Sequence, residues 1–427
     1  MKNFKLLLPL ILFLLLVIAY YPILNWFFAR DDFGFLPHLP TTLNNISAIL
    51  TPPNYWFFRP LSQQFYFWAG EFLWGLNPEW FRLFALALLA INSWLVYKLT
   101  KRFTKTGPAI ISAVFYGLNT THLFEIGWIC ANYQTISATL FLLTVLLATA
   151  QNKKAQLFSF VTLFLSFLSS EMSVFAAPVI VVYKLIKAKE RPLDIKPYVK
   201  SALPYLGLTL FYLVFYFSYV RLPGGDVYGR FFDPGSLIKI LGKYLAYPFV
   251  AGFDRSGLIT PVNLLLALKM FILFQVAVFA MIERRINWRL VIFGSSWFLI
   301  TISIFIFLSN HTFAYLEAIP MAGLSLVIAT TWEEIFSHKK IATAVTALLV
   351  ATSFVTLVAA QTTDPNLKWL NEHQQASRYY LSLSTLTYPK NNRFVLDRND
   401  EWLMETTYFG HIISAFYKDK SPAVILK

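Results

Sequence analysis

Long apolar runs alternate with short polar segments along most of the chain. Crossing a bilayer as a helix takes roughly 20 apolar residues. Runs near this length occur at 6–28, 80–97, 107–119, 133–150, 155–169, 174–186, 201–219, 261–281, 290–308, 313–332 and 341–360. The third and sixth runs are short, which suits tilted helices or helices shielded by their neighbours. The pattern predicts an all-α integral membrane protein, a multi-pass bundle of about 11 transmembrane helices.

The composition agrees with a bilayer as the main solvent of this chain. Of its 427 residues, 57% are hydrophobic and 14% are charged, whereas a soluble domain carries roughly 25% charged residues. The mean hydropathy is +0.56. The first apolar run exceeds the roughly 7–15 residues of a signal peptide, so we expect an uncleaved first helix. Cys130 is the only cysteine, which excludes an intramolecular disulfide and a cysteine-based metal site.

Basic residues concentrate on one side of the predicted membrane. If the N-terminus is cytoplasmic, the inner segments carry 19 Lys and Arg residues and the outer loops carry seven. The positive-inside rule then predicts a cell-membrane protein with its N-terminus in the cytoplasm and its C-terminus outside. The same rule accounts for most of the net charge of +14 without a nucleic-acid partner.

The polar segments suggest a division of the chain into two parts. A transmembrane domain is expected at 1–360, with large outer loops at 30–79 and 220–260, and a small extracytoplasmic segment at 361–427. Within the second outer loop, 236–253 has the pattern of an amphipathic helix lying in the membrane interface. In the C-terminal segment, 367–386 reads as a helix and 394–400 as a short strand and turn.

Ionisable residues gather at the predicted outer ends of the spans. Asp31 and Asp32 directly follow the first span, and a carboxylate in an apolar setting has a raised proton affinity and can act as a general base. Arg59 lies among aromatic residues, and a guanidinium matches phosphate oxygens. His122 and Glu125 share a helix face, which fits a proton relay or contacts to sugar hydroxyls. Each group also has a simpler interpretation. Asp31 and Asp32 could be solvated charges that end the first span, Arg59 could belong to an interfacial aromatic belt, and His122 and Glu125 could form a local hydrogen-bonded pair.

Further polar residues fall on the same predicted face. Glu171 separates two spans, and His311 lies in another tight outer turn. The second outer loop contributes Arg230, Lys239 and Lys243, which would either cradle a lipid phosphate or attach the loop to the membrane. Segments far apart in the sequence thus place acids, histidines and basic groups together at one membrane face.

The order of these motifs resembles that of GT-C-type glycosyltransferases, in particular the protein O-mannosyltransferases and their relatives with tetratricopeptide tails. Asp31 and Asp32 match an acidic pair after the first span, and 58–61 matches an "F/Y-R-P-L" segment. The stretches 119–128, 170–178 and 311–323 are similar to three later family segments. Two positions depart from the family pattern: Ser170 replaces a basic residue, and His311 stands where arginine is common.

The resemblance implies an enzyme that transfers a sugar, with inversion, from a polyprenyl-phosphate donor to an acceptor hydroxyl at the extracytoplasmic face. The acceptor would be a protein, lipid or glycan, and membrane lipids would surround the bundle. Expected residue roles are a catalytic base from Asp31 or Asp32, donor-phosphate contacts from Arg59, Arg230, Lys239, Lys243 and His311, and substrate orientation by His122, Glu125 and Glu171. No cofactor is expected, and a divalent metal on Asp and Glu oxygens is not favoured.

Three other functions fit part of the pattern. A transporter or flippase would place ionisable groups near the membrane midplane, but the predicted spans are almost free of charge, which favours chemistry at the surface. A ligase or polymerase of polyprenyl-linked glycans would use a large basic outer loop such as 220–260. An inactive scaffold would fit the replacement at Ser170.

Overall fold

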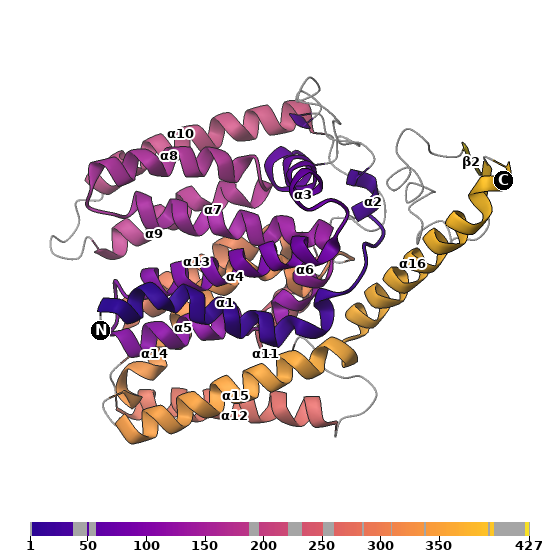
Figure 1. The fold of residues 1–427 in the computed structure, drawn as a ribbon. Coiled ribbons are helices and arrows are strands. Elements are labelled where there is room, and N and C mark those ends of the chain that lie inside the picture. The colour runs from indigo at the N-terminus through magenta and orange to yellow at the C-terminus, as the bar shows by residue number, and fades with distance from the viewer. Residues whose placement is uncertain are drawn as a thin grey trace.

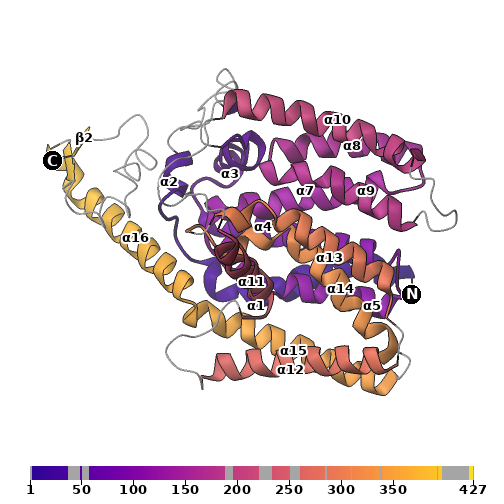
Figure 2. The ribbon, with the colours of Figure 1, turned by 180° about the vertical axis from the view of Figure 1, so that it is seen from behind.

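The computed structural model (Figures 1 and 2) shows a helical bundle with a C-terminal helix that extends away from it. It describes residues 2–36, 49–50, 57–187, 196–220, 233–250, 260–283, 286–308, 310–336, 339–391, 393–396 and 423–426.

Each of the eleven predicted spans corresponds to a helix. These are α1 (Lys2–Leu24), α4 (Pro78–Thr100), α5 (Thr106–Gly117), α7 (Tyr133–Ala148), α8 (Lys153–Phe167), α9 (Ala176–Lys187), α10 (Lys196–Tyr219), α12 (Pro261–Ile282), α13 (Trp288–Ile302), α14 (Pro320–Ile335) and α15 (Lys339–Thr363). Among the described residues, six segments are long and apolar enough to cross a membrane. They are Leu7–Leu24, Pro78–Thr100, Ile129–Ala148, Lys200–Tyr219, Pro261–Ile282 and Lys340–Thr363. The chain is therefore a multi-pass membrane protein.

Several helix boundaries differ from the sequence prediction; the ninth helix, for example, ends at Ile302 rather than at residue 308. The first helix ends at Leu24 rather than at residue 28, because the backbone carbonyls of Leu24, Trp26 and Phe27 accept hydrogen bonds from a buried arginine of α4. The tenth begins at Pro320 rather than at residue 313, since a short 3-10 helix precedes it. Proline favours the first turn of a helix, where its missing N–H costs nothing.

Short elements collect at the end of the bundle where α1 finishes, opposite the N-terminus (Figure 1). They are α2 (Asp32–Phe35), the π-helix η3 (Pro60–Phe65), α3 (Tyr66–Trp74), α6 (Leu123–Gly127), α11 (Pro234–Val250) and the 3-10 helices η4 (Thr120–His122), η5 (Ile129–Asn132), η6 (Glu171–Phe175), η8 (Phe305–Phe307) and η9 (Ala314–Glu317). The amphipathic helix predicted in the second outer loop is confirmed as α11.

Close packing inside the bundle depends on small residues between α13 and α14. A Cβ atom added to Gly294 would lie 2.4 Å from the carbonyl oxygen of Gly323, and one added to Gly323 would lie 2.5 Å from that of Gly294. Small residues let membrane helices approach backbone to backbone. The buried indoles of Trp297 and Trp332 belong to the same two helices, so this contact forms part of the apolar core.

The C-terminal segment begins with α16 (Pro365–Asn391), which confirms the helix predicted there. The strand β1 (Arg393–Leu396) pairs in parallel with β2 (Ala423–Leu426), with Arg393 opposite Ala423. The strand predicted from residue 394 is thus confirmed in part, and residues 397–400 lie outside the described residues. In Figures 1 and 2, α16 leaves the bundle at the end that carries the short elements.

Candidate functional site

The first part of the candidate site forms where η3 packs on the turn between α8 and η6. The backbone N–H of Leu61 donates to the carbonyl of Leu168 at 2.9 Å, and the Ser62 hydroxyl donates to the carbonyl of Ser169 at 2.5 Å. The Ser170 hydroxyl accepts from the N–H of Met172 and so caps η6. These contacts bring together two segments more than 100 residues apart in the sequence.

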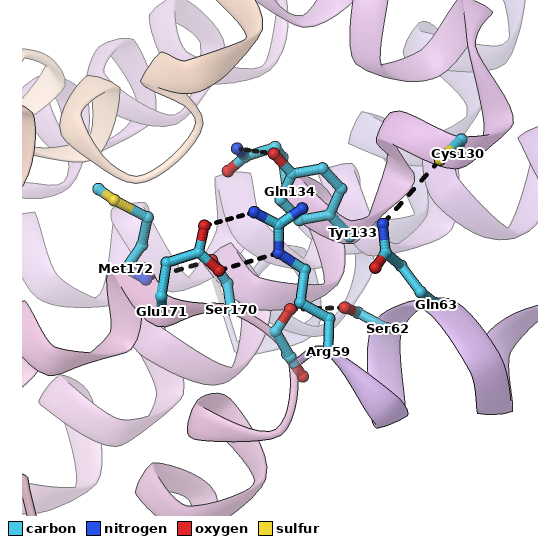
Figure 3. Close-up of polar contacts among 10 residues, drawn as sticks. Arg59, Ser62, Gln63, Cys130, Tyr133, Gln134, Ser170, Glu171 and Met172 are labelled. Carbon is cyan, nitrogen blue, oxygen red and sulfur yellow. Dashed lines mark hydrogen bonds and ion pairs between the residues drawn. The ribbon is translucent and has the colours of Figure 1, made fainter. Parts of the chain in front are cut away.

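Arg59 lies at the centre of this contact, with 5% of its surface exposed. Its Nε donates to Glu171 Oε2 at 2.9 Å, and its Nη2 pairs with Glu171 Oε1. The guanidinium carbon is 4.2 Å from the ring centroid of Phe57 and 3.9 Å from that of Tyr133. Figure 3 shows the remaining nitrogen, Nη1, directed away from Glu171. The side chain is therefore fixed by a bidentate carboxylate and two aromatic rings, with one donor group left over.

The Arg59 charge governs the ionisation of its neighbours. Burial alone would raise the pKa of Glu171, but the charge and hydrogen bonds of Arg59 hold that pKa below its usual range. Burial and the charge of Arg59 together lower the pKa of His311 to about 4. His311 is therefore neutral near pH 7, so the phosphate contact predicted for it would be a hydrogen bond rather than an ion pair.

The acidic pair forms a second part of the site. Asp32 is fully buried, and its carboxylate accepts from the N–H of Ala29 at 2.9 Å and from the N–H of Cys130 at 2.6 Å. Asp31 precedes α2 and is only half-buried. Arg30 has a φ of 48°, a conformation that non-glycine residues rarely adopt. In this arrangement Asp32 holds the segment that follows α1 against η5, and Asp31 is the more accessible carboxylate.

One short helix, η5, links the two parts. The N–H of Cys130 donates to Asp32, while the Cys130 sulfur lies 4.0 Å from the donor Gln63 Nε2 in η3. Tyr133, which follows η5, stacks on Arg59 (Figure 3). The structure thus joins the predicted base and the predicted phosphate-binding arginine through a single turn of backbone.

The environment of Asp32 predicts a pH-dependent stability. Burial raises its pKa to about 7, although the hydrogen bonds from Ala29 and Cys130 and the charge of Arg82 act in the opposite direction. The unfolded chain releases this proton at about pH 4. The protonated Asp32 therefore stabilises the folded chain fully below about pH 4, and this stabilisation is lost as the pH rises through about 7.

We expect the thermal stability of the Asp32→Asn variant not to show this decline with rising pH. The measurement is the thermal unfolding midpoint from about pH 4 to 8, with Glu283→Gln, an exposed carboxyl at the other end of the bundle, as the matched control. An equal decline in wild type and Asp32→Asn would contradict the prediction.

His122 and Glu125 form a separate buried hydrogen-bonded pair through His122 Nδ1. The His122 ring lies 4.8 Å from that of Tyr116, and burial raises the pKa of Glu125 although His122 opposes this effect. The pairing predicted from their spacing is confirmed, but both side chains are sealed from solvent. Within the described part of the chain, no group of three His, Cys, Asp or Glu side chains is placed to hold a metal ion.

The basic second loop is described only in part. Lys239 and Lys243 are exposed on α11, and Lys243 Nζ lies 3.5 Å from the hydroxyl of Thr312. The Tyr244 hydroxyl lies 3.5 Å from the carbonyl of His311, so α11 packs beside the turn that carries this histidine. Arg230 falls outside the described residues, and its predicted phosphate contact stays a prediction.

The sequence analysis assigned no role to three buried groups. Arg82 in α4 has no exposed surface and donates to backbone carbonyls of Leu24, Trp26, Phe27, Pro78 and Gly127. Lys269 in α12 is buried 5.5 Å from the Phe115 ring, and both carboxyl oxygens of the buried Glu317 lack a hydrogen-bond partner among the described residues. The sequence signal that could have drawn attention to them is a charge inside an apolar run, because such charges are rare in membrane spans unless they have a function.

Comparison with known proteins identifies the fold. No family model matches the sequence, and no curated protein matches it. The structure is similar to that of ArnT from Cupriavidus metallidurans bound to undecaprenyl phosphate, with a TM-score of 0.51, 12% identity and coverage of 98% of this chain and 89% of that chain.

A second similar structure is the oligosaccharyltransferase AglB from Archaeoglobus fulgidus in complex with an inhibitory peptide and a dolichol-phosphate. The TM-score is 0.49 with 14% identity, over 89% of this chain and 59% of that chain. The likeness to ArnT shows that the chain has the multi-pass helical fold of that protein, which agrees with the GT-C-type fold expected from the sequence resemblance.

Proposed function

We propose that this chain transfers a sugar from a polyprenyl-phosphate donor to an acceptor hydroxyl at the extracytoplasmic membrane face. The observation that carries the proposal is the bridge through η5, which joins a fixed guanidinium to an acidic segment at one end of the bundle. Glycosyl transfer from a phosphate needs both groups, a cation at the leaving phosphate and a base at the attacking hydroxyl. The fold shared with ArnT, a structure with bound undecaprenyl phosphate, supports the choice of donor.

The geometry supports a direct displacement. Asp31 accepts the proton of the acceptor hydroxyl, the acceptor oxygen forms a bond to the anomeric carbon, and the bond from that carbon to the phosphate oxygen breaks. The leaving polyprenyl phosphate carries the electron pair and meets the free Nη1 side of Arg59. One displacement inverts the configuration at the sugar carbon. Asp32 positions Asp31 by holding the backbone N–H groups of Ala29 and Cys130.

The distribution of charge supports the outer face as the location. The end of the bundle with Arg59 and Asp31 is the end predicted to be extracytoplasmic, since Lys and Arg residues concentrate at the other end. Polyprenyl-phosphate donors keep the phosphate at the interface while the lipid lies among helices, and exposed Lys239 and Lys243 on α11 would attract that phosphate.

A donor-turnover assay tests the proposal. The purified chain in nanodiscs is incubated with a panel of radiolabelled polyprenyl-phosphate sugars, and release of sugar or transfer to an acceptor is measured. We expect turnover with at least one donor and a loss of about 100-fold or more in Asp31→Asn, because the base is removed while the shape is kept. Glu283→Gln, at the opposite end of the bundle, is the matched control.

The outcomes separate the candidate functions. Turnover that is equal in wild type and Asp31→Asn would reject Asp31 as the base. Donor binding without turnover in folded protein would favour a transporter or flippase over an enzyme. Extension of a polyprenyl-linked glycan instead of single-sugar transfer would favour a ligase or polymerase.

A further inference from the structure

A cavity of about 230 Å³ opens at the same end of the bundle, away from Arg59. Its walls come from the end of α1 and the segment after it, the end of α15 and the start of α16. The lining residues are Pro22, Trp26, Gln361, Thr362, Lys368 and Asn371. The functional roles assigned above involve none of these side chains.

The surface of the cavity wall is mainly apolar, and its lining residues include four polar side chains but no acidic one. Gln361 is 3% exposed; its Nε2 donates to the carbonyls of Ala19 and Leu357 at 2.7 and 3.2 Å, while its buried Oε1 has no partner among the described residues. A buried acceptor without a partner is costly unless a ligand or water donates to it. Gln361 thus brings a buried acceptor that no described residue satisfies to the wall of the cavity.

The other side chains narrow the class of ligand. Trp26 offers an aromatic surface, Thr362 and Asn371 offer hydrogen-bonding groups, and Lys368 offers a positive charge. Aromatic and amide groups together suit a ring with hydroxyl groups, and a lysine suits a phosphate or carboxylate as a point charge. The lining therefore fits a hydroxyl-rich group that also carries an anionic substituent.

The cavity is connected to the acidic segment on two sides. The Trp26 carbonyl accepts from Nη1 of Arg82, whose charge also acts on Asp32. Lys368 precedes Trp369, and the Arg30 guanidinium carbon lies 4.7 Å from the centroid of the Trp369 ring. Arg30 is next to Asp31 in the chain, so Trp369, the neighbour of Lys368 in α16, contacts the segment that carries the proposed base.

Arg59 and the cavity lie among different helices. Arg59 packs on Tyr133 of α7 and Glu171 of η6, whereas the cavity lies among α1, α15 and α16. In Figures 1 and 2, α2 lies beside α3 at the end of the bundle where α16 leaves it. A direct displacement needs the attacking hydroxyl on the face of the sugar opposite the leaving phosphate, so separate donor and acceptor sites suit it.

We propose that the cavity lined by Trp26, Gln361 and Lys368 is the acceptor subsite, and that it takes a hydroxyl-rich, anionic headgroup or phosphosugar. The assignment of this cavity to the acceptor rests on the proposed function, but the binding of a ligand in the cavity does not. The acceptor hydroxyl would project from the cavity rim toward Asp31, while the anionic substituent stays on Lys368.

Binding is measured without donor, so that failure here is distinct from failure of the enzyme proposal. Glucose 6-phosphate and glucose are titrated against the full chain in nanodiscs by saturation-transfer NMR, and retention of phosphatidylinositol against phosphatidylcholine is measured by native mass spectrometry. We expect glucose 6-phosphate or phosphatidylinositol to bind in preference to its control. The Lys368→Met variant should bind at least about tenfold more weakly, and Lys368→Arg should keep most of the affinity.

Variants of the cavity and of Arg59 distinguish binding in the cavity from binding at the proposed donor site. Asn371→Leu, with an unchanged unfolding midpoint, should also weaken binding, whereas Arg59→Ala should leave it unchanged. Phosphatidylinositol retained alone would assign a lipid-borne acceptor, and glucose 6-phosphate bound alone would assign a soluble one. Binding of neither probe, or binding lost in Arg59→Ala but kept in Lys368→Met, would overturn the proposal.

Discussion

Turnover of the polyprenyl-phosphate donor is expected to fall by about 100- to 1,000-fold in the Arg59→Ala variant, as for the loss of one preorganised group that stabilises developing negative charge. Arg59 is held by Glu171 and by the rings of Phe57 and Tyr133 before any donor arrives, so no reorganisation is needed when the phosphate leaves. The measurement is single-turnover release of labelled sugar under saturating donor.

Two further variants test whether position as well as charge matters. Arg59→Lys keeps the charge but cannot make the bidentate contact with Glu171, so it should recover only part of the rate. Arg289→Ala removes an exposed arginine at the opposite end of the bundle and should leave the rate unchanged. A rate in Arg59→Ala within a few-fold of wild type would remove Arg59 from the site.

The largest loss of stability is expected in Arg82→Met. This side chain satisfies backbone carbonyls from the end of α1, from Pro78 and from Gly127. Leaving such buried acceptors unpaired costs about 1–3 kcal/mol each before relaxation. We expect a net loss of about 3–5 kcal/mol, as when one partner of a buried charged contact is removed. The thermal midpoint should fall by about 10 °C.

The measurement is thermal unfolding in detergent or nanodiscs, with Arg289→Met as the control for loss of an exposed arginine. Because Arg82 and Asp32 interact, the double variant Arg82→Met with Asp32→Asn should lose less than the sum of the single losses. Strict additivity, or a midpoint for Arg82→Met equal to that of wild type, would show that Arg82 does not hold this segment.

The sequence by itself determined the helices, because each apolar run must satisfy its backbone hydrogen bonds internally in a membrane. That requirement is local, so the eleven runs, the amphipathic α11 and the start of the C-terminal segment were all predictable. The spacing of His122 and Glu125 was also local, and their pairing follows from helix geometry alone.

Only the tertiary structure decided which distant residues meet. The contact of Arg59 with Glu171 depends on η3 packing against the α8–η6 turn, a pairing that no local pattern encodes. The difference between Asp31 and Asp32, adjacent and chemically identical in sequence, arises from the N–H groups of Ala29 and Cys130 around one of them. The charge of Arg82 is tolerated because its carbonyl partners come from three separate segments. Burial and hydrogen bonding are properties of the assembled bundle, and for that reason the sequence could name Arg59, Asp31 and Asp32 but not their contacts.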